Sequence, residues 1–370
     1  MIQGVLNFTG RSFKLQIMSQ LALVYESAQK QYIQSIPIPE PLTGYIQVRI
    51  EAAAINPLDQ KVHRATTIQG IDLIDQQIYD FAHRFIQKCP TVLGADAAGE
   101  VTKIGPGVTK FNVGDRVVFA CTPNSPEGYQ QLNTLQIPAS IDYDSASSFP
   151  VAGNTAAGAL YGQLKFMEPW VGGEGAYTGQ KIVILGGSSS VGSYGFNLCT
   201  TIQLAALGGL EVVTTSSPAY FDHLKSLGAT TVIDRSAPDV AAQILVAASG
   251  PAKYVDCISL LPTQLLGVEI LEPQRKLVLV LSTQPPTTAA AEAKGVTLLG
   301  TSGPSGAYFR YSAYEPFWDS LEKYYFERGV VKFNKPTVLR GGLHAWEKGF
   351  ELHRQGKVSG TKIVIRRQET

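Results

Sequence analysis

The sequence predicts an α/β protein with one mostly β domain and one doubly wound domain. The chain has 370 residues, which is too long for one ordinary core. Between about residues 21 and 138, short alternating or β-branched runs are separated by turns, a pattern typical of antiparallel strands. After residue 145, wholly apolar strands alternate with helical segments, which indicates a parallel sheet covered on both faces.

The elements follow in this order. In the mostly β domain we expect strands over 21–27, 44–55, 94–105 and 114–121. Isoleucine and phenylalanine recur at helical spacing over 67–88, which predicts one or two inserted helices. In the doubly wound domain we expect strands over 181–187, 211–216, 230–234, 254–259 and 275–282, with helices over 191–207, 221–228 and 240–248. A helix over 342–355 and an alternating strand over 361–367 close the chain, and we expect this strand to return to the first domain.

The composition is that of an ordinary globular protein. Hydrophobic residues make up 44% of the chain and charged residues 16%, so a large core can form. The formal net charge of +1 gives no electrostatic reason to expect nucleic acid or an anionic membrane as a partner. The four cysteines are scattered singly, no apolar run approaches a membrane span, and the N-terminus lacks the order of a signal peptide. We therefore expect a cytoplasmic protein.

A glycine-rich turn lies in KIVILGGSSSVG, residues 181–192. In a dinucleotide-binding turn, successive glycines make the bend, admit the pyrophosphate and let the helix pack on the strand. Gly187, Ser189 and Gly192 occupy these positions, between a strand and a helix. An ordinary strand-to-helix turn is the alternative, but this order favours nucleotide binding. Hydroxyl and helix N-terminal N–H groups are then expected to contact phosphate in the following residues: Gly187, Ser188, Ser189, Ser190, Val191 and Gly192.

The end of the second strand of this domain indicates which nucleotide binds. An NAD-binding fold places an acidic residue there, and this chain has Ser216 and Ser217 instead. Because a carboxylate would repel a 2′-phosphate, its absence, with Tyr220 and Lys225 nearby, favours NADPH. The alternatives are a helix N-cap for Ser217 and a solvated lysine for Lys225. The ends of later strands are expected to add further cofactor contacts: Ile258, Leu281 and Ser282.

Four further stretches resemble the medium-chain dehydrogenase/reductase superfamily: INPLD at 55–59, LGADAAGEV at 93–101, GPGVTKFNVGDRV at 105–117, and GGLHAWEKGFELHRQGKVSGTKIVI at 341–365. The resemblance covers nearly all of residues 18–367. It implies a GroES-like, mostly β catalytic domain, a Rossmann NADPH-binding domain, and an active site in the cleft between them. The limits that we expect are an extension over 1–17, a catalytic domain over 18–154 and 337–370, and a Rossmann domain over 155–336.

The resemblance also indicates whether the chain carries the zinc ligands of the superfamily. Zinc-dependent members keep cysteine or histidine at three positions that look like Asn56, Ala95 and Val151 here, and none of these is a usual zinc ligand. The four-cysteine structural lobe is also missing, because only Cys121 lies in that region. The chain therefore resembles the zinc-free branch, which includes quinone oxidoreductases and the trans-acting enoyl reductases of fungal polyketide pathways. Without a Lewis acid, a polarised alkene is a better partner for hydride than an alcohol.

From this resemblance we expect an NADPH-dependent reductase of α,β-unsaturated carbonyl compounds or enoyl thioesters, which adds hydride to the β-carbon before the α-carbon is protonated. Three residues are candidates for catalysis. Lys61 lies where zinc enzymes tend to keep a relay histidine, and similar enoyl reductases carry a lysine in this region. Asn56 can donate and accept hydrogen bonds in the cleft, and Thr155 matches a family threonine close to nicotinamide. The alternatives are a surface lysine, a turn residue and a helix cap.

Two other functions stay open, namely an NADPH:quinone oxidoreductase and a nucleotide-binding protein without turnover. The expected substrate is a small molecule or is bound to a carrier, in which case a polyketide synthase would be the partner. Monomer and homodimer are both compatible with the sequence, because 296–303 could form an edge strand that pairs with a second copy or is capped.

Overall fold

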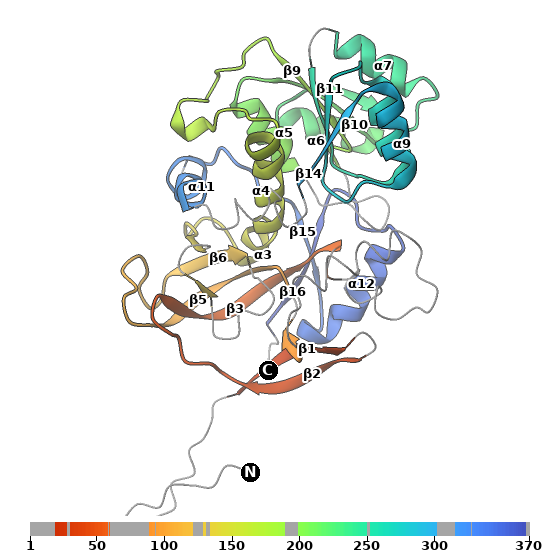
Figure 1. Ribbon diagram of the computed structural model, residues 1–370. Coiled ribbons are helices and arrows are strands. Elements are labelled where there is room, and N and C mark those ends of the chain that lie inside the picture. The colour runs from red at the N-terminus through yellow and green to blue at the C-terminus, as the bar shows by residue number, and fades with distance from the viewer. Residues whose placement is uncertain are drawn as a thin grey trace, which may run out of the picture.

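The computed structural model describes residues 19–27, 30–57, 59, 89–92, 94–120, 129–130, 134–188, 199–249, 252–301, 315–326 and 328–367. Lys61, the segment 67–88 and the turn residues 189–192 lie outside the described residues. The chain forms a mostly β lobe and an α/β lobe, and the helix α4 (Pro150–Ala157) lies between them (Figure 1).

Strands from both ends of the chain share the main sheet of the β lobe. The order is β15-β16-β3-β5-β6-β8, and β7 also pairs with β3. The strands are β3 (Tyr45–Ile55), β5 (Asp96–Ile104), β6 (Arg116–Ala120), β7 (Tyr129–Gln130), β8 (Thr134–Gln136), β15 (Pro336–Leu339) and β16 (Lys362–Arg366). Strand β16 runs antiparallel to β3, so the C-terminal strand lies in the sheet built by the N-terminal part of the chain.

A smaller antiparallel sheet lies beside the main one (Figure 1). Its order is β2-β1-β4, formed by β1 (Ser19–Ser27), β2 (Lys30–Pro37) and β4 (Thr91–Val92). The 3₁₀ helix η6 (Gly342–Ala345) and helix α12 (Trp346–Arg354) cover this part of the lobe. Leu23, Trp346, Phe350 and Ile363 share one apolar cluster, which joins β1 and α12 to the C-terminal strand.

The α/β lobe is built on a parallel sheet in the order β11-β10-β9-β12-β13-β14. Numbered from its first strand, this is the order 3-2-1-4-5-6 of a Rossmann fold. The strands are β9 (Lys181–Leu185), β10 (Glu211–Ser216), β11 (Ala229–Asp234), β12 (Ala252–Asp256), β13 (Lys276–Leu279) and β14 (Thr297–Gly300). The predicted α/β class and doubly wound sheet are confirmed.

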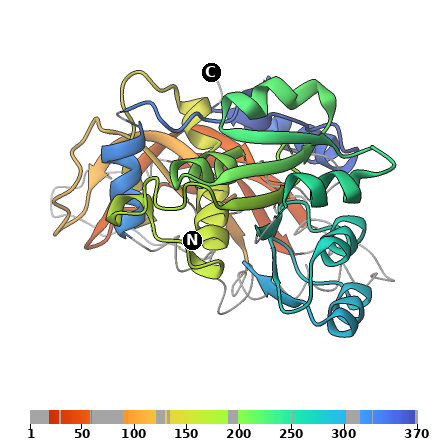
Figure 2. The ribbon, with the colours of Figure 1, turned by 90° about the horizontal axis from the view of Figure 1, so that it is seen from above.

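Helices cover both faces of this sheet (Figure 2). They are α5 (Cys199–Leu207), α6 (Phe221–Ser226), α7 (Val240–Ala247), α8 (Leu261–Ile270) and α9 (Pro285–Lys294). Successive side chains of β9 point to opposite faces. Ile184 accordingly packs in the cluster that contains residues of α5 and α6. Leu185 packs in the cluster that contains residues of α7, α8 and α9.

The structure departs from the sequence prediction around β12. This strand ends at Asp256, earlier than the predicted strand over 254–259. The Asp256 side chain accepts hydrogen bonds from the backbone N–H groups of Ile258 (2.9 Å) and Ser259 (2.8 Å), which closes a turn. Ser259 has a φ of 52°, a left-handed conformation that cannot continue a strand. Helices α8 and α9 follow this region, and the sequence pattern did not predict them.

Helix α4 connects the two lobes. It begins with Pro150 after the short helix α3 (Tyr143–Ser147) and continues as the π-helix η2 (Gly158–Gln163). Every residue of α4 is buried. The segments α11 (Glu315–Ser320) and η5 (Leu321–Phe326) pack near its start, where Phe149 and Phe326 meet edge to face with ring centroids 5.4 Å apart. The limits predicted for the two domains stay a prediction.

Within the stretches described above, none of the helices combines the length and apolar character that crossing a bilayer would require.

Candidate active site

A buried ion pair lies at one end of the main β sheet. Lys362 Nζ is 3.1 Å from Asp96 Oδ2, and the two side chains are 3% and 0% exposed. The strand register explains how they meet, because Ala54 on β3 lies opposite Asp96 and Ile55 lies opposite Ile363. The first residues of β5 and β16 are therefore brought together beside the last residues of β3.

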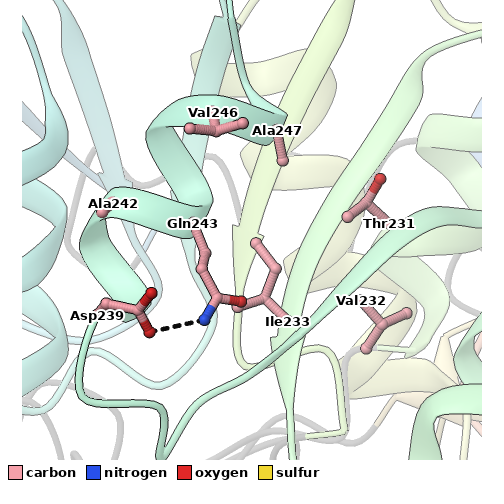
Figure 3. A pocket seen from close by; sticks show the side chains of 8 residues that line it. All are labelled: Thr231, Val232, Ile233, Asp239, Ala242, Gln243, Val246 and Ala247. Carbon is pink, nitrogen blue, oxygen red and sulfur yellow. Dashed lines mark hydrogen bonds between the residues drawn. The ribbon is translucent and has the colours of Figure 1, made fainter.

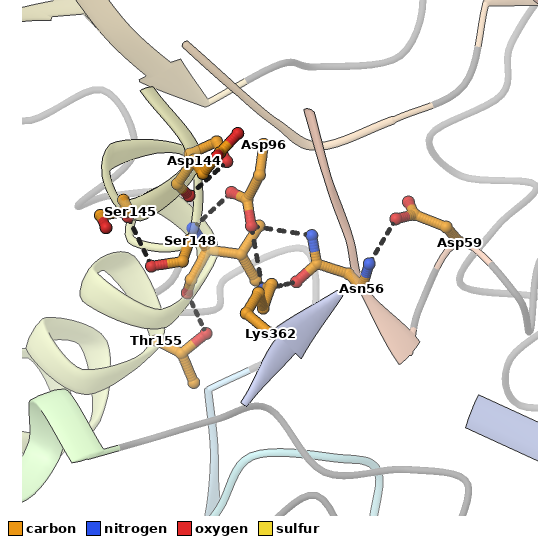
Figure 4. A network of polar contacts seen from close by, with 10 residues as sticks. Asn56, Asp59, Asp96, Asp144, Ser145, Ser148, Thr155 and Lys362 are labelled. Atoms are coloured by element: carbon orange, nitrogen blue, oxygen red, sulfur yellow. Dashed lines mark hydrogen bonds and ion pairs between the residues drawn. The ribbon is translucent and has the colours of Figure 1, made fainter. Parts of the chain in front are cut away.

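Asn56, which directly follows β3, completes this network (Figure 4). Its Oδ1 atom accepts a hydrogen bond from Lys362 Nζ at 2.6 Å, and its Nδ2 atom donates to Asp96 Oδ2 at 2.8 Å. Asp96 Oδ1 accepts from the backbone N–H of Val151 at 2.8 Å. The polar groups of this 0% exposed asparagine are thus held by a cation on one side and an anion on the other.

Asp59 extends the network beyond Asn56. Its Oδ2 atom accepts a hydrogen bond from the Asn56 backbone N–H at 2.7 Å. Burial raises the pKa of Asp59 from 3.8 to about 7, and the negative charge of Asp96 acts in the same direction. The Asn56 hydrogen bond and Lys362 oppose this change in pKa. Asp59 as a whole residue is partly buried, and loss of water around its carboxyl group is the main cause of the raised pKa.

Asp59 is expected to make stability depend on pH. Its folded pKa is raised, so between about pH 4 and 7 the native state holds a proton that the unfolded state has released. Stability should therefore fall as pH rises through this window, by up to about 1.4 kcal/mol per pH unit from this group. Asp59→Asn keeps an acceptor for the Asn56 N–H but cannot titrate, so urea unfolding at pH 5 and pH 8 should show a smaller difference in the variant.

The matched control for this experiment is Asp142→Asn. The side chain of Asp142 accepts from the Ser145 N–H at 2.7 Å, and the pKa of Asp142 is lowered, so it does not titrate between pH 5 and 8. The buried Asp256, with a pKa raised to about 6, contributes a similar slope to all three proteins. Equal slopes in wild type and Asp59→Asn would contradict the raised pKa of Asp59.

Thr155 lies one helical turn after Val151 on α4 and is 3% exposed. Its hydroxyl donates to the Val151 carbonyl at 2.7 Å, which fixes the side chain while its oxygen can still accept a hydrogen bond. The structure therefore joins Asn56 and Thr155 through Asp96 and Val151. The third catalytic candidate, Lys61, lies outside the described residues.

The described part of the glycine-rich turn is closely packed. Gly186 has a φ of 83° and donates its N–H to Thr215 Oγ1 at 3.0 Å. A Cβ atom on Gly187 would lie 2.4 Å from Thr214 Oγ1 and 2.9 Å from Ile202 Cδ1. Only glycine fits at residue 187, since the turn lies directly against β10 and α5. This close approach is what a dinucleotide-binding turn requires.

The polar residues at the end of β10 fall into two groups. The Ser216 hydroxyl is buried and lies 2.5 Å from the hydroxyl of Ser188, so both are engaged inside the turn. Ser217 is partly exposed and makes no side-chain cap for the following 3₁₀ turn, η4 (Pro218–Tyr220). Lys225 is exposed on α6. Ser217 and Lys225 are therefore the residues of this group whose side chains reach the surface.

Tyr220 bridges the two lobes. Its hydroxyl donates to the carbonyl of Ser359 at 2.9 Å. Its ring lies against Gly360, where an added Cβ would be 2.2 Å from Tyr220 Cε1. The turn that contains Ser359 and Gly360 leads directly into β16 and Lys362. Tyr220 thus connects the expected cofactor lobe to the strand that supplies the buried cation.

The remaining cofactor candidates lie at the carboxyl ends of β12 and β13. Ile258 is buried, Leu281 is partly buried and Ser282 is exposed. Gln264 Nε2 donates to the carbonyls of Ser259 (2.9 Å) and Ser282 (3.0 Å), which ties the two loops together. Both loops are at the sheet edge where ligands of doubly wound folds bind.

The zinc-ligand positions offer no metal-binding set. Asn56 takes part in the network through its side-chain amide and its backbone N–H, and Val151 through its backbone N–H. The side chain of Ala95 has no atom that could bind a metal. Among the residues that the structure describes, no three His, Cys, Asp or Glu side chains come together in a way that could hold a metal ion. The chemistry of these donors does not fit zinc.

A separate pocket of about 430 Å³ lies between β11 and α7 (Figure 3). Thr231, Asp239, Gln243 and Val246 are among the residues that line it, and Asp239 accepts from Gln243 Nε2 at 2.7 Å. This pocket is formed by the outer edge strand of the parallel sheet and contains none of the predicted site residues. It is not part of the candidate active site.

From the sequence alone, no role in the site was assigned to Lys362 or to Asp96. The signal was present, because Lys362 opens an otherwise apolar run, KIVI, whose other members are buried. A lysine at the start of a buried strand needs an internal partner. The sequence could not name that partner.

Comparison with known proteins finds a matching family and several relatives. Residues 43–146 match the alcohol dehydrogenase GroES-like domain family. The chain is 32% identical to the trans-enoyl reductase himH of Aspergillus japonicus over 333 residues, which is 86% of this chain and 89% of that protein. It is 28% identical to lovC of Aspergillus terreus, the enoyl reductase component of lovastatin nonaketide synthase, over 89% of this chain and 91% of that protein.

A third relative matches over a shorter stretch. Dehydrogenase azaJ of Aspergillus niger is 37% identical over 236 residues, which is 59% of this chain. The match spans 61% of that relative, which is less than two thirds of its length.

Proposed function

Because the chain belongs to the medium-chain dehydrogenase/reductase superfamily, we propose that it is an NADPH-dependent, zinc-independent reductase of the carbon–carbon double bond in α,β-unsaturated carbonyl compounds or enoyl thioesters. The observation that carries the proposal is the similarity to a trans-enoyl reductase along 86% of the chain. The residues at the positions that resemble zinc-ligand positions support it, since their side chains do not suit zinc, the Lewis acid of the zinc-dependent members of the superfamily.

The residues around the glycine-rich turn fit a dinucleotide. Gly187 lets the turn pack directly against β10 and α5, and no carboxylate follows β10, where Ser216 and Ser217 lie. Bound NADPH would supply a hydride for the β-carbon of the substrate. The turn, Ser217 and Lys225 would hold its phosphates, with Lys225 providing the charge that a 2′-phosphate requires.

The protein's own residues must then stabilise an oxyanion and deliver a proton to the α-carbon. We assign the oxyanion contact to Lys61, which follows Asp59 by two residues in the sequence. Thr155 would contact the nicotinamide through its hydroxyl oxygen. The oxygen and the nitrogen of the Asn56 side-chain amide are both hydrogen-bonded, so Asn56 would act by holding this part of the site in place.

The proposed function is tested by mixing the protein with NADPH and, separately, a short enoyl thioester, an enone and a quinone, while the absorbance of the reduced cofactor is followed. Loss of absorbance with the thioester or the enone supports the proposal. Turnover of the quinone alone would favour the quinone oxidoreductase, and binding without any oxidation would favour a non-catalytic protein. Near-normal turnover of Lys61→Ala would remove Lys61 from the mechanism.

Cofactor preference provides a further prediction. Lys225→Ala is expected to raise KM for NADPH by about 10-fold or more, because a charged hydrogen bond contributes about 1.5–3 kcal/mol. KM for NADH, which has no 2′-phosphate, should change little. The matched control is Lys276→Ala, which removes an exposed lysine at the amino end of β13, away from the expected cofactor edge. Equal effects on the two cofactors would contradict the assignment.

The partner follows from the substrate class. Two relatives are named as enoyl reductases, and lovC is named as a component of a polyketide synthase. We propose by analogy that a polyketide synthase presents a carrier-bound thioester to this chain. Incubating the protein with a free thioester and with the same acyl group on a carrier protein tests this, and a higher kcat/KM for the carrier-bound form is expected.

A further inference from the structure

The network of Asn56, Asp96 and Lys362 joins parts of the chain that are far apart in sequence. Lys362 is 306 residues from Asn56 and 266 residues from Asp96, yet it hydrogen-bonds to both. All three side chains are buried. The network therefore exists only when β3, β5 and β16 are correctly paired.

The charges of the network determine how the Asn56 amide is oriented. Its oxygen faces the Lys362 ammonium and its nitrogen faces the Asp96 carboxylate. Turning the amide over would place two donors together at Lys362 and two acceptors together at Asp96. Removal of the ammonium weakens this preference, since only Asp96 would then distinguish the two amide orientations.

Asp96 transmits the arrangement to helix α4. The first N–H groups of a helix need acceptors, and Phe149, the residue before α4, makes no side-chain cap. Asp96 Oδ1 accepts from the Val151 N–H, so a residue of β5 acts as the cap. The Val151 carbonyl in turn accepts from the Thr155 hydroxyl. Lys362 pairs with Asp96, Asp96 accepts from Val151, and Val151 accepts from Thr155. Lys362 is therefore the first residue in the series of contacts that ends at Thr155.

The Lys362 ammonium lies beside two of the positions that resemble zinc-ligand positions. Two of the positions that look like zinc-ligand positions, Asn56 and Val151, contribute atoms to the network, and the ammonium of Lys362 lies among them. Stability alone does not account for a buried ion pair, because well-packed neutral groups of similar size are often equally stable. A role in positioning does account for it.

We propose that Lys362 is a positioning residue, whose ammonium fixes the Asn56 amide and the Asp96 carboxylate and thereby holds Thr155 in the geometry that turnover requires. The proposal rests on the reductase function proposed above. It concerns kcat more than cofactor affinity, because Gly187, Ser217 and Lys225, which would hold the phosphates, lie in the other lobe, whereas Thr155 would contact only the nicotinamide.

The test uses the double variant Lys362→Met/Asp96→Asn, which removes both charges and leaves no unpaired buried ion. The single variant Lys362→Met leaves Asp96 buried without its cation and serves only to measure unfolding. We expect the double variant to melt close to the wild type, to bind NADPH with unchanged Kd, and to lose about 100-fold in kcat, the effect of misplacing a reacting group by about 1 Å. Lys357→Met, which removes an exposed lysine before β16, should change none of these.

Two outcomes would overturn the proposal. A folded double variant with wild-type kcat would show that the charges do not position the site. A parallel loss of melting temperature, NADPH binding and kcat would show that the pair is only structural. If the wild type oxidises NADPH with none of the three substrates, the proposed function fails first, and this proposal fails with it.

Discussion

Asp96→Ala is expected to lower the free energy of unfolding by about 3–5 kcal/mol, the cost of leaving one member of a buried ion pair without its partner. The variant leaves the Lys362 ammonium without its partner, at a site where the Lys362 side chain is 3% exposed. It also removes the acceptors of the Asn56 Nδ2 group and of the Val151 N–H. Urea unfolding monitored by far-UV circular dichroism measures the change.

A surface pair gives the matched comparison. Arg354 and Glu351 form an ion pair on α12 whose side chains are 43% and 45% exposed. Glu351→Ala should therefore cost less than about 1 kcal/mol, because solvent screens such pairs. A similarly small loss for Asp96→Ala would contradict the burial and pairing of Lys362.

Gly187→Ala is expected to lower stability by about 1–3 kcal/mol through overpacking. The new Cβ would lie 2.4 Å from Thr214 Oγ1 and 2.9 Å from Ile202 Cδ1, and neither β10 nor α5 can move away without disturbing the core. Because the turn would shift as a unit, we expect the Kd for NADPH to rise by about 10-fold or more, equivalent to about 1.4 kcal/mol. Thermal unfolding and fluorescence titration with NADPH measure the two effects.

Gly208→Ala is the control for this substitution. An added Cβ at Gly208 would come no closer than 3.3 Å to the Ala205 carbonyl oxygen and 3.6 Å to Tyr177 Cδ2. We expect little change in NADPH binding there. Equal loss of affinity in both variants would mean that the packing of the turn at Gly187 has no particular role.

The elements that sequence patterns predict are those with a strong local signal. The apolar run of β9 identifies a buried parallel strand, because such strands are covered on both faces. Helix α9 has no such signal, since in PPTTAAAEAK only Thr287 and Ala291 are buried. In α8 the buried set includes Gln264, which interrupts an apolar pattern. Both helices were missed for this reason.

The residues of the candidate active site also fall into those with a local sequence signal and those without one. Gly187 and the serines at the end of β10 could be proposed as cofactor contacts from the sequence, because a glycine-rich turn is contiguous in sequence. Lys362 could not, because the partner of a buried lysine depends on which strands pair and in which register. The role of Asp96 as the cap of α4 depends on the same register.

By itself the sequence determined the α/β class, the doubly wound sheet and the position of the glycine-rich turn, since strand and turn signals act over a few neighbouring residues. Only the tertiary structure decided that Lys362, Asp96 and Asn56 form one buried network at the start of α4. The physical reason is the sheet register: β16 pairs with β3, and β3 with β5, so that charges separated by 266 residues neutralise each other in the core.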